Sequence, residues 1–322
     1  MAFKSGFVAI VGRPNAGKST LVNTLVGRKV AIVSPRPQTT RNRIQGILNR
    51  EDAQIVLIDT PGIHRPGNVL SRQMMDEVQH ALEGIDVLSL IVDASAEFGA
   101  GDRFSLEWIR RFHGDVFLLL NKIDRIAKPH LLPLIDRYRK QFEFVEIYPI
   151  SALTGEGTLD LVKGWLERLP EAPPYLPADQ FTDQPERFLA AEMIREKAIL
   201  ATREEVPHAI AVIVDSFEEG EKLLRIRATM YVEREGQKGI LIGKGGATAK
   251  KIGTDARKEL EELLGVKIFL ELTVEVRENW RQSASVVRQL DWHRQLEELG
   301  EMQAEDEAEE GEDAKGTEPR ES

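Results

Sequence analysis

The sequence predicts an α/β domain with a mostly parallel sheet flanked by helices, followed by a smaller α+β domain and an acidic tail. Through the first 170 residues, short apolar runs alternate with helix-length polar segments. Four prolines then fall within residues 170–177, a composition typical of a semi-rigid spacer. We therefore place the first domain at residues 1–170, the linker at 171–186, the second domain at 187–296 and a disordered tail at 297–322.

The first predicted strand and helix flank a glycine-rich loop. Phe7–Val11 is an apolar run typical of a buried strand, and Thr20–Val26 has helical spacing that ends at Gly27. Between them, Gly12–Ser19 matches G-x-x-x-x-G-K-[ST], the phosphate-binding P-loop pattern. Backbone N–H groups would surround phosphates there, and Lys18 would supply a point charge. The predicted phosphate-binding residues are Gly12, Asn15, Ala16, Gly17, Lys18, Ser19 and Thr20.

The later strands of the first domain place polar residues at one edge of the sheet. Apolar runs predict strands at Ile55–Ile58, Val87–Val92, Val116–Leu120 and Val145–Ile150. Asp59 follows the first of these runs and Asn121 follows the third. Because ligand sites lie at the carboxyl ends of parallel strands, both side chains are expected near the P-loop.

Three further motifs follow the P-loop in the order typical of guanine-nucleotide sites. They are Asp59-Thr60-Pro61-Gly62, Asn121-Lys122-Ile123-Asp124 and Ser151-Ala152-Leu153. The Asp124 carboxylate can accept from guanine N1–H and the exocyclic amine together, a pair that adenine does not offer. Asn121 and Lys122 would brace the base and the ring oxygen, while the backbone of Ser151 and Ala152 would contact guanine O6. The sequence therefore predicts a domain that binds GTP and GDP in preference to adenine nucleotides.

Any metal in this chain is predicted to be held by oxygen. Cysteine is absent, which excludes disulfides and thiolate sites, and the six His show no ligand spacing. Ser19 offers a hydroxyl to Mg²⁺, and Asp59 would act through a bound water.

Two segments are predicted to be nucleotide-dependent switches. Ser34–Arg41 is polar and interrupted by prolines, and a Thr within it can reach Mg²⁺ and the γ-phosphate only in the triphosphate state. We choose Thr40 over Thr39 for this role. The second switch would run from Gly62 to about Met75, because its glycines permit large backbone changes. The predicted catalytic residues are Lys18, Thr40 and Gly62.

These motifs resemble the Era GTPases, bacterial ribosome-assembly proteins with a C-terminal KH domain. The resemblance rests on four stretches and extends over about residues 5–290. The stretches are Gly12–Ser19, Gln38–Arg41, Asp59–Gly62 and Asn121–Asp124. The resemblance implies a P-loop GTPase domain whose slow hydrolysis assists maturation of the small ribosomal subunit. It also implies a peripheral membrane association, for which the sequence itself offers no amphipathic anchor.

One departure from Ras-like GTPases concerns the water-orienting residue. Ile63 occupies the position of the Ras-like Gln and has no polar group. In GTPases that resemble this one, an Asn at the position of Asn15 can help to hold a K⁺ near the phosphates. We hypothesise K⁺-stimulated hydrolysis; the alternative is that Asn15 only caps the loop. No side-chain base is assigned, and His64 is expected to be a loop residue.

The C-terminal half has the element order α-β-β-α-α-β, which resembles the bacterial type II KH fold. A helical pattern comes first, and alternating runs predict two strands after it. The predicted elements are a helix through Phe188, Met193, Ile194 and Ala198, strands at Ala209–Val214 and Leu223–Val232, the run Ile240–Gly246, a helix from about Ala247 to Leu264 and a strand at Val266–Val276.

A basic glycine loop within this half predicts an RNA contact. Residues 234–258 contain seven Lys or Arg against Glu235 and Asp255. Gly243-Lys244-Gly245-Gly246 fits the KH loop G-x-x-G, where nucleic-acid backbone approaches peptide N–H groups. The predicted RNA-binding residues are Gly243, Lys244, Gly245, Gly246, Lys250 and Lys251.

Two apolar features of this half leave alternatives open. Ile240, Ile242 and Ile252 could floor a groove for unstacked bases, which would suit single-stranded RNA, or could belong to the core. Residues 290–292 read Leu-Asp-Trp where the family has Leu-Gly-aromatic, so contacts expected from the last helix are in doubt.

The net charge of −10 belongs to the tail. Residues 297–322 hold twelve Asp or Glu and two Lys or Arg, so residues 1–296 carry no net charge. The tail would be a solvated, solubilising segment or would compete with nucleic acid for basic surface. No apolar run approaches eighteen residues and no signal-peptide pattern is present, so we expect a soluble cytoplasmic protein.

Together these features predict a switch controlled by GTP and GDP that assists small (30S) subunit assembly. The resemblance implies that its partners are the small-subunit precursor and single-stranded ribosomal RNA near the 3′ end. We expect a monomer with no obligate protein partner. One alternative is a passive RNA-binding assembly factor with GTP as a structural ligand. Another is a related GTPase acting on transfer-RNA modification or the large subunit, against which the G-x-x-G loop and the single nucleotide domain argue.

Overall fold

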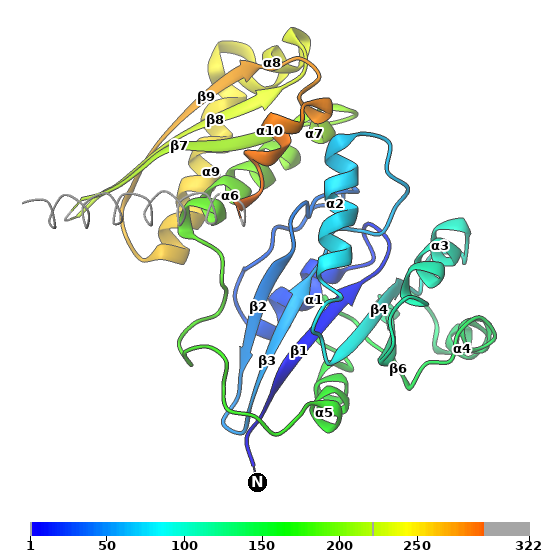
Figure 1. Ribbon diagram of the computed structural model, residues 1–322. Coiled ribbons are helices and arrows are strands. Elements are labelled where there is room, and N and C mark those ends of the chain that lie inside the picture. Colours follow the sequence, from blue (N-terminus) through cyan, green and yellow to red (C-terminus); the bar gives the residue numbers. More distant parts are fainter. Residues whose placement is uncertain (1, 221, 293–322) are drawn as a thin grey trace, which may run out of the picture.

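The computed structural model describes residues 2–220 and 222–292, which form two sheet-containing units joined by an extended segment (Figure 1). The predicted tail at 297–322 and the end of the predicted second domain at 293–296 lie outside the described residues. None of the helices within the described ranges combines the length and the apolar character that crossing a lipid bilayer requires.

The first unit is built on a six-stranded sheet with the strand order β2-β3-β1-β4-β5-β6. Its strands are β1 (Lys4–Val11), β2 (Ile44–Asn49), β3 (Ala53–Asp59), β4 (Val87–Asp93), β5 (Asp115–Asn121) and β6 (Glu146–Pro149). All neighbouring strands pair in parallel except β2, which runs antiparallel to β3 at one edge. The predicted mostly parallel sheet is confirmed, and the edge strand β2 is an addition to the prediction.

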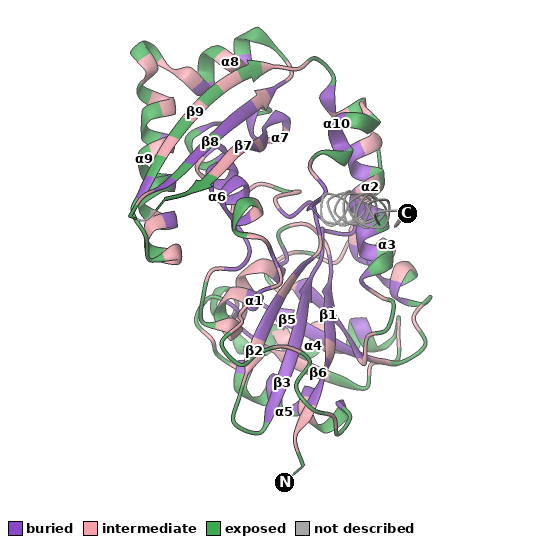
Figure 2. Ribbon diagram, turned by 60° about the vertical axis from the view of Figure 1, so that its left-hand side comes forward, coloured by how far each residue is buried: buried purple, intermediate pink, exposed green. Residues whose placement is uncertain are grey.

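Helices cover both faces of this sheet because its strands alternate two sets of apolar residues. The helices are α1 (Lys18–Val26), α2 (Val69–His80), α3 (Ala100–Ile109), α4 (Leu131–Arg139) and α5 (Thr158–Arg168), with 3-10 turns η1 (Ile123–Arg125) and η2 (Lys128–His130). Val8 and Ile10 pack in the same core as α1 and α5. Ala9 and Val11 face the opposite core, to which α2, α3 and α4 contribute. The central strands β1, β3 and β5 are buried along most of their length (Figure 2).

The register of the sheet brings the motif residues to one edge. Asp59 is the last residue of β3 and lies opposite Ile10, next to the start of the P-loop. Asn121 is the last residue of β5 and lies opposite Asp93 at the end of β4. The carboxyl ends of these strands therefore share one edge with the N-terminus of α1.

The second unit carries a three-stranded sheet with helices packed on one face. Its strands are β7 (Ala211–Glu219), β8 (Leu224–Val232) and β9 (Ile268–Val276), with β7 antiparallel and β9 parallel to β8. Its helices are α6 (Glu186–Ala201), α7 (Val206–Ala209), α8 (Glu235–Ile242), α9 (Ala247–Leu264) and α10 (Ala284–Arg288), with 3-10 turns η3 (Lys244–Gly246) and η4 (Trp280–Gln282). The predicted order of elements is confirmed, and α9 has the predicted bounds.

The predicted strand at Ala209–Val214 is displaced along the chain. Residues 206–209 form the short helix α7, whose Pro207 suits a helix N-terminus. The strand β7 begins at Ala211 and continues through the polar residues that end at Glu219. This polar half escaped the prediction because it offers the sheet few apolar side chains.

The segment between the two units is fastened to the first sheet. Gln54 accepts the N–H groups of Tyr175 and Leu176 through Oε1 at 2.8 and 3.0 Å. Further along, the N–H of Ile47 donates to the carbonyl of Phe181 at 2.9 Å. The proline-rich linker thus runs along the edge strand β2 and covers part of its free hydrogen-bonding edge.

An apolar cluster joins the two units beyond the linker. Leu70 and Met74 of α2 pack with Trp280 of η4 and with Val286 and Val287 of α10. Trp280 is fully buried, and its indole N–H donates to the carbonyl of Ala209 at 2.8 Å. The second switch therefore continues into a helix that packs on the C-terminal unit.

Candidate functional site

The P-loop forms a compact turn ahead of α1. Gly17 adopts φ 102°, and a Cβ placed on it would lie 2.2 Å from Nδ2 of Asn121. The buried ammonium of Lys18 donates to the carbonyls of Gly12 and Arg13 at 3.3 and 3.0 Å. Because Gly17 needs both a left-handed backbone and no side chain, only glycine fits this position without strain.

Three oxygen-bearing side chains converge beside the P-loop. The hydroxyl of Ser19 donates to Oδ2 of Asp59 at 2.6 Å and lies 2.9 Å from the hydroxyl of Thr40. Thr40 is also 3.4 Å from Asp59 Oδ2. The hydroxyl of Thr39 instead donates to the carbonyl of Arg36 at 2.8 Å, which points it away from this cluster. Of the two threonines, the structure brings only Thr40 to the other predicted metal ligands.

Burial dominates the electrostatics of this cluster. It raises the pKa of Asp59 to about 6, although Lys18 and the hydroxyl groups of Ser19 and Thr40 oppose the rise. Burial likewise lowers the pKa of Lys18 to about 8, against the opposing charge of Asp59. Both groups are thus poorly solvated. An opposite charge close to either group therefore stabilises its ionised form.

The cluster fits a hard divalent cation. Oδ1 of Asp59 is buried and has no hydrogen-bond partner among the described residues. Hydroxyl and carboxylate oxygens are the ligands that Mg²⁺ prefers, and it takes only one or two carboxylates with phosphate and water. A cavity of about 490 Å³ adjoins the cluster and is lined by the P-loop, residues 32–35 and 38–40, Gly62, Asp93, Lys122 and Arg125. The residues present therefore suit a magnesium–nucleotide complex.

The predicted base-recognition residues are tied to the P-loop and to one another. Asn121 donates from Nδ2 to the carbonyl of Ala16 at 2.7 Å and accepts the N–H of Ala152 at 2.8 Å. The Ser151 hydroxyl donates to Asp124 Oδ1 at 2.6 Å. These bonds hold the three motifs, distant in the sequence, in one continuous surface.

Asp93 is a member of this surface that the sequence prediction missed. It forms an ion pair of 2.6 Å with the ammonium of Lys122, which also donates to the carbonyl of Asn15 at 2.7 Å. Burial alone would raise the pKa of Asp93, but the bonds from Lys122 and Ser95 outweigh it and lower that pKa. Its place at the end of β4, matching Asp59 at the end of β3, is the signal that could have found it.

The start of the second switch lies against the P-loop. A Cβ on Gly62 would lie 2.6 Å from the nitrogen of Pro14, so only glycine fits. Ile63 is buried, and its N–H donates to the carbonyl of Gly12 at 2.9 Å. The ring of His64 contacts the carbonyl of Gly62 at 2.6 Å through Nδ1. The water-orienting position is thus occupied by an apolar side chain within the core.

Asn15 contacts the first switch directly. It adopts φ 63°, and its side-chain amide donates to the carbonyl of Pro35 at 3.0 Å. This bond joins the P-loop to the first switch and places the carbonyl oxygen of Pro35 beside the amide nitrogen of Asn15. A neutral carbonyl oxygen is the ligand type expected for a monovalent cation.

The G-x-x-G loop lies between α8 and α9 and is exposed. Gly243, Gly245 and Gly246 adopt φ of 72°, 61° and 81°, which glycine tolerates best. Lys244 at the tip is exposed, as are Lys250 and Lys251 on the first turns of α9. The backbone is therefore open to an approaching strand, with one cation at the tip of the loop and two on the helix that follows it.

The structure separates the three isoleucines considered for a groove. Ile252 is buried in the core of the second unit, whereas Ile240 is 49% exposed. Near the end of the described chain, Trp292 is buried with its ring 5.7 Å from that of Phe188. Only Ile240 and the half-buried Ile242 remain available to an apolar ligand at this loop.

Comparison with protein families recognises both units separately. Residues 7–122 match the family model described as a 50S ribosome-binding GTPase. Residues 205–281 match the model of the KH domain.

Two solved structures resemble the whole chain. A crystal structure of Era in complex with MgGDPNP and nucleotides 1506–1542 of 16S ribosomal RNA is 44% identical to this chain. The match covers 89% of this chain and 98% of that one, with a TM-score of 0.87. A crystal structure of a single-residue variant of Aquifex aeolicus Era, bound to GDP·AlF4⁻, is also 44% identical, over 89% of this chain and 99% of that one, with a TM-score of 0.86.

Proposed function

Because this chain belongs to the Era family of GTPases, we propose that it couples GTP hydrolysis to binding of single-stranded RNA near the 3′ end of small-subunit ribosomal RNA. In this function it assists assembly of the small subunit, with the subunit precursor as its partner. The observation that carries the proposal is the match, over 89% of this chain, to an Era solved with MgGDPNP and 16S ribosomal RNA. The broader match to a 50S ribosome-binding GTPase covers the nucleotide unit alone and leaves the RNA unit unaddressed.

The nucleotide site supports the hydrolytic half of this proposal. The predicted domain at residues 1–170 would bind GTP with the P-loop around the phosphates and Asp124 on the base. Ser19 and Thr40 would hold Mg²⁺ with Asp59 beside them, since the Ser19 hydroxyl lies 2.9 Å from Thr40 and 2.6 Å from Asp59. Bound Mg²⁺ supplies positive charge to the phosphate oxygens. Lys18 supplies a second charge, and the poorly solvated site strengthens its attraction to the phosphate oxygens.

Ile63 leaves the attacking water without a polar side chain at the usual position, so intrinsic turnover is expected to be slow. We propose that K⁺ held by the Asn15 side chain compensates for this. The contact between Asn15 and Pro35 supports the idea, because a cation there would touch both the P-loop and the first switch. Equal turnover in matched KCl and NaCl buffers would leave Asn15 as a loop cap only.

The exposed G-x-x-G loop supports the RNA half of the proposal. The predicted domain at residues 187–296 would receive RNA at Gly243–Gly246, with Lys244, Lys250 and Lys251 meeting phosphates. A GTP-dependent change in the switches would then alter this domain, since both switches contact it. We also propose a cytoplasmic location, where ribosomal precursors are found.

The test measures RNA affinity and turnover together. A fluorescent oligonucleotide with the 3′-terminal small-subunit sequence, and a shuffled one, are titrated with the GDP form and the GppNHp form. We expect tighter binding of the native sequence and a difference between the two nucleotide forms. Equal affinity in both forms, with turnover unchanged by RNA, would favour the passive RNA-binding factor. Equal affinity for both oligonucleotides would reject the proposed target.

A further inference from the structure

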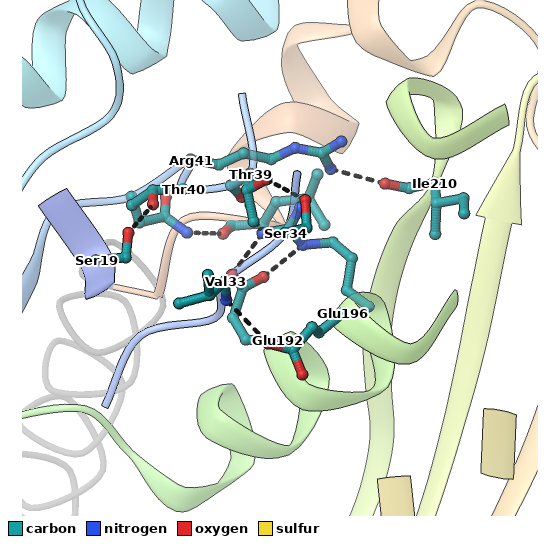
Figure 3. Close-up of polar contacts among 12 residues, drawn as sticks. Ser19, Val33, Ser34, Thr39, Thr40, Arg41, Glu192, Glu196 and Ile210 are labelled. Atoms are coloured by element: carbon teal, nitrogen blue, oxygen red, sulfur yellow. Dashed lines mark hydrogen bonds and ion pairs between the residues drawn. The ribbon is translucent and has the colours of Figure 1, made fainter. Parts of the chain in front are cut away.

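The RNA-binding unit forms hydrogen bonds with the first switch and its flank on both sides of Thr40, and we call this set of contacts the grip. A guanidinium N–H of Arg195 on α6 donates to the carbonyl of Thr39 at 2.5 Å. From the same helix, Oε1 of Glu196 accepts the N–H of Val33 at 2.9 Å. Beyond Thr40, Arg41 reaches back and donates to the carbonyl of Ile210 at 2.8 Å (Figure 3).

The two α6 side chains are themselves rigidly held. Arg195 is 2% exposed, and its Nε and Nη2 donate to the Glu192 carboxylate at 2.7 and 2.5 Å. The carboxylate of Glu196 is ion-paired with Lys29 at 2.5 Å and Lys197 at 2.9 Å. Charge-assisted bonds of this kind fix the direction of the group as well as adding energy. The contacts to the switch are therefore made from a stiff support.

The carbonyl that Arg195 holds belongs to the residue directly before Thr40, which is one of the predicted metal ligands. The carbonyl of Thr39 and the N–H of Thr40 belong to a single planar peptide unit. Holding that carbonyl therefore fixes the plane from which the Thr40 side chain projects. In the same arrangement the Thr40 hydroxyl lies 2.9 Å from that of Ser19 (Figure 3).

We propose that Arg195 and Glu196 are positioning residues for GTP hydrolysis, supplied by the RNA-binding unit to hold the first switch with Thr40 at the metal site. The inference rests on the proposed function and adds the residues through which the two units communicate. Any such coupling is reciprocal: a triphosphate that orders the switch must strengthen docking of α6 by the same factor. RNA that alters the docking must in turn alter the preference for GTP over GDP.

A second contact between the units makes this role separable from simple docking. Leu70 and Met74 pack on Trp280, Val286 and Val287 without involving Arg195 or Glu196. Replacing Arg195 leaves this apolar contact in place. The domains are therefore expected to stay associated in a variant that has lost only the grip.

The decisive variants change charge and hydrogen bonding in matched ways. Arg195→Gln alone would leave the buried Glu192 carboxylate without its charge partner. The double variant Glu192→Gln with Arg195→Gln is therefore used beside it. Glu196→Gln keeps an acceptor for the Val33 N–H, whereas Glu196→Met removes it. Arg187→Gln is the control, because Arg187 lies on the same helix but donates to Val214 and Asp215 of its own unit.

The experiment uses the full chain with Mg²⁺ and fluorescent GDP or GppNHp. We expect the double variant and Glu196→Met to weaken GppNHp about tenfold while changing GDP less than about twofold, the loss of one charge-assisted bond. Arg187→Gln should keep the wild-type ratio. Glu196→Gln keeps the acceptor but loses the ion pairs with Lys29 and Lys197, so its ratio should fall between those of the wild type and Glu196→Met. Hydrogen exchange should rise in residues 33–42 of the two affected variants when GppNHp is bound, and GTP turnover should fall.

Other results would contradict either the positioning role or the proposed function. An unchanged ratio of the two affinities in both affected variants, or the same shift in Arg187→Gln, would overturn the positioning role. A wild-type chain that binds both nucleotides but never turns over GTP would reject the proposed function instead. The affinity ratio and the exchange data would still report on the grip in that case, so the two failures are distinct.

Discussion

The hydroxyl of Ser151 donates to the carboxylate of Asp124 at 2.6 Å, across 27 residues of sequence. This bond leaves the other carboxylate oxygen, which lies 4.0 Å from Nε of Arg125, on the open side of the group. Ser151 is fully buried, so the carboxylate is anchored from within the protein. Its orientation is fixed before any base arrives, which favours selective recognition over induced rearrangement.

Asp124→Asn should change the base specificity of the site from guanine to xanthine. The amide can donate to the C2 carbonyl of xanthine, where the carboxylate can only accept from the guanine amine. We expect GDP affinity to fall by about a hundredfold or more and XDP affinity to rise. Competition titrations with GDP, XDP and ADP measure both changes, with the exposed Asp160→Asn as control. Unchanged guanine affinity in the Asp124 variant would contradict this role.

Gly17→Ala and Gly27→Ala separate backbone strain from loss of the site. Both glycines have positive φ, 102° and 74°, so each substitution should cost about 1 kcal/mol of unfolding free energy. Only at Gly17 would the new methyl group collide with Asn121; nothing lies within 4 Å at Gly27. GDP affinity should fall more than about tenfold in Gly17→Ala alone. Calorimetry and nucleotide titration give the two quantities, and parallel affinity losses would refute the argument.

Lys244→Ala should weaken RNA binding in a salt-dependent way. The side chain is exposed at the tip of the G-x-x-G loop, where it can meet a phosphate without base specificity. Removing one phosphate contact should reduce the slope of log K against log salt by about 0.7 for a single strand. Anisotropy titrations at several KCl concentrations measure the slope. Lys163→Ala, on α5 of the nucleotide unit and 73% exposed, should leave it unchanged.

Acidification should lower the free energy of unfolding through His208, whose carbonyl accepts a hydrogen bond from Arg41 of the first switch. Burial and the nearby guanidinium groups of Arg41, Arg281 and Arg36 lower the pKa of His208 below its ordinary value of 6.5. Arg281 is itself paired with Glu233, which faces the same space. The unfolded chain therefore binds a proton at higher pH than the folded one. The stabilisation is complete above pH 6.5 and is lost as pH falls through the lowered value.

The free energy of unfolding of His208→Gln should consequently fall less than that of the wild type between about pH 7.5 and about pH 5. Because the imidazole is partly exposed, the difference from wild type should be less than about 1 kcal/mol. Denaturant unfolding at both pH values measures it, with the exposed His113→Gln as control. A wild-type pH profile retained in His208→Gln would assign the effect to other groups.

The nucleotide unit was largely predictable from the sequence because local signals agree there. Gly27 ends α1 where the helical spacing stops, and Asp59 and Asn121 stand at the ends of the strands whose apolar runs precede them. The edge strand β2 was missed because Gln45, Gly46 and Asn49 interrupt its apolar pattern. That glycine is required by contact, since a Cβ there would lie 2.6 Å from Val22 on α1.

The grip on the first switch could not be predicted in the same way. Arg195 and Thr39 are 156 residues apart, and the acceptor is a main-chain carbonyl that any residue possesses. No side-chain pattern therefore marks the partner. The sequence could not show which of Ile240 and Ile252 is buried, for a similar reason. Both suit a helix face, and only the packing of α9 on the second sheet decides between them.

The fastening of the linker limits how the two units can rearrange. Thr182 donates to the carbonyl of Gln45 at 2.8 Å, and Gln184 donates to that of Val30 at 2.9 Å, two residues before α6 begins at Glu186. While these bonds last, little more than Pro185 remains free in the linker. When the contacts with the first switch and with α2 open, the RNA-binding unit can rotate about the first turn of α6 but stays close, so those contacts re-form within one molecule. Lengthening the chain at residue 185 would loosen that pivot without touching either site.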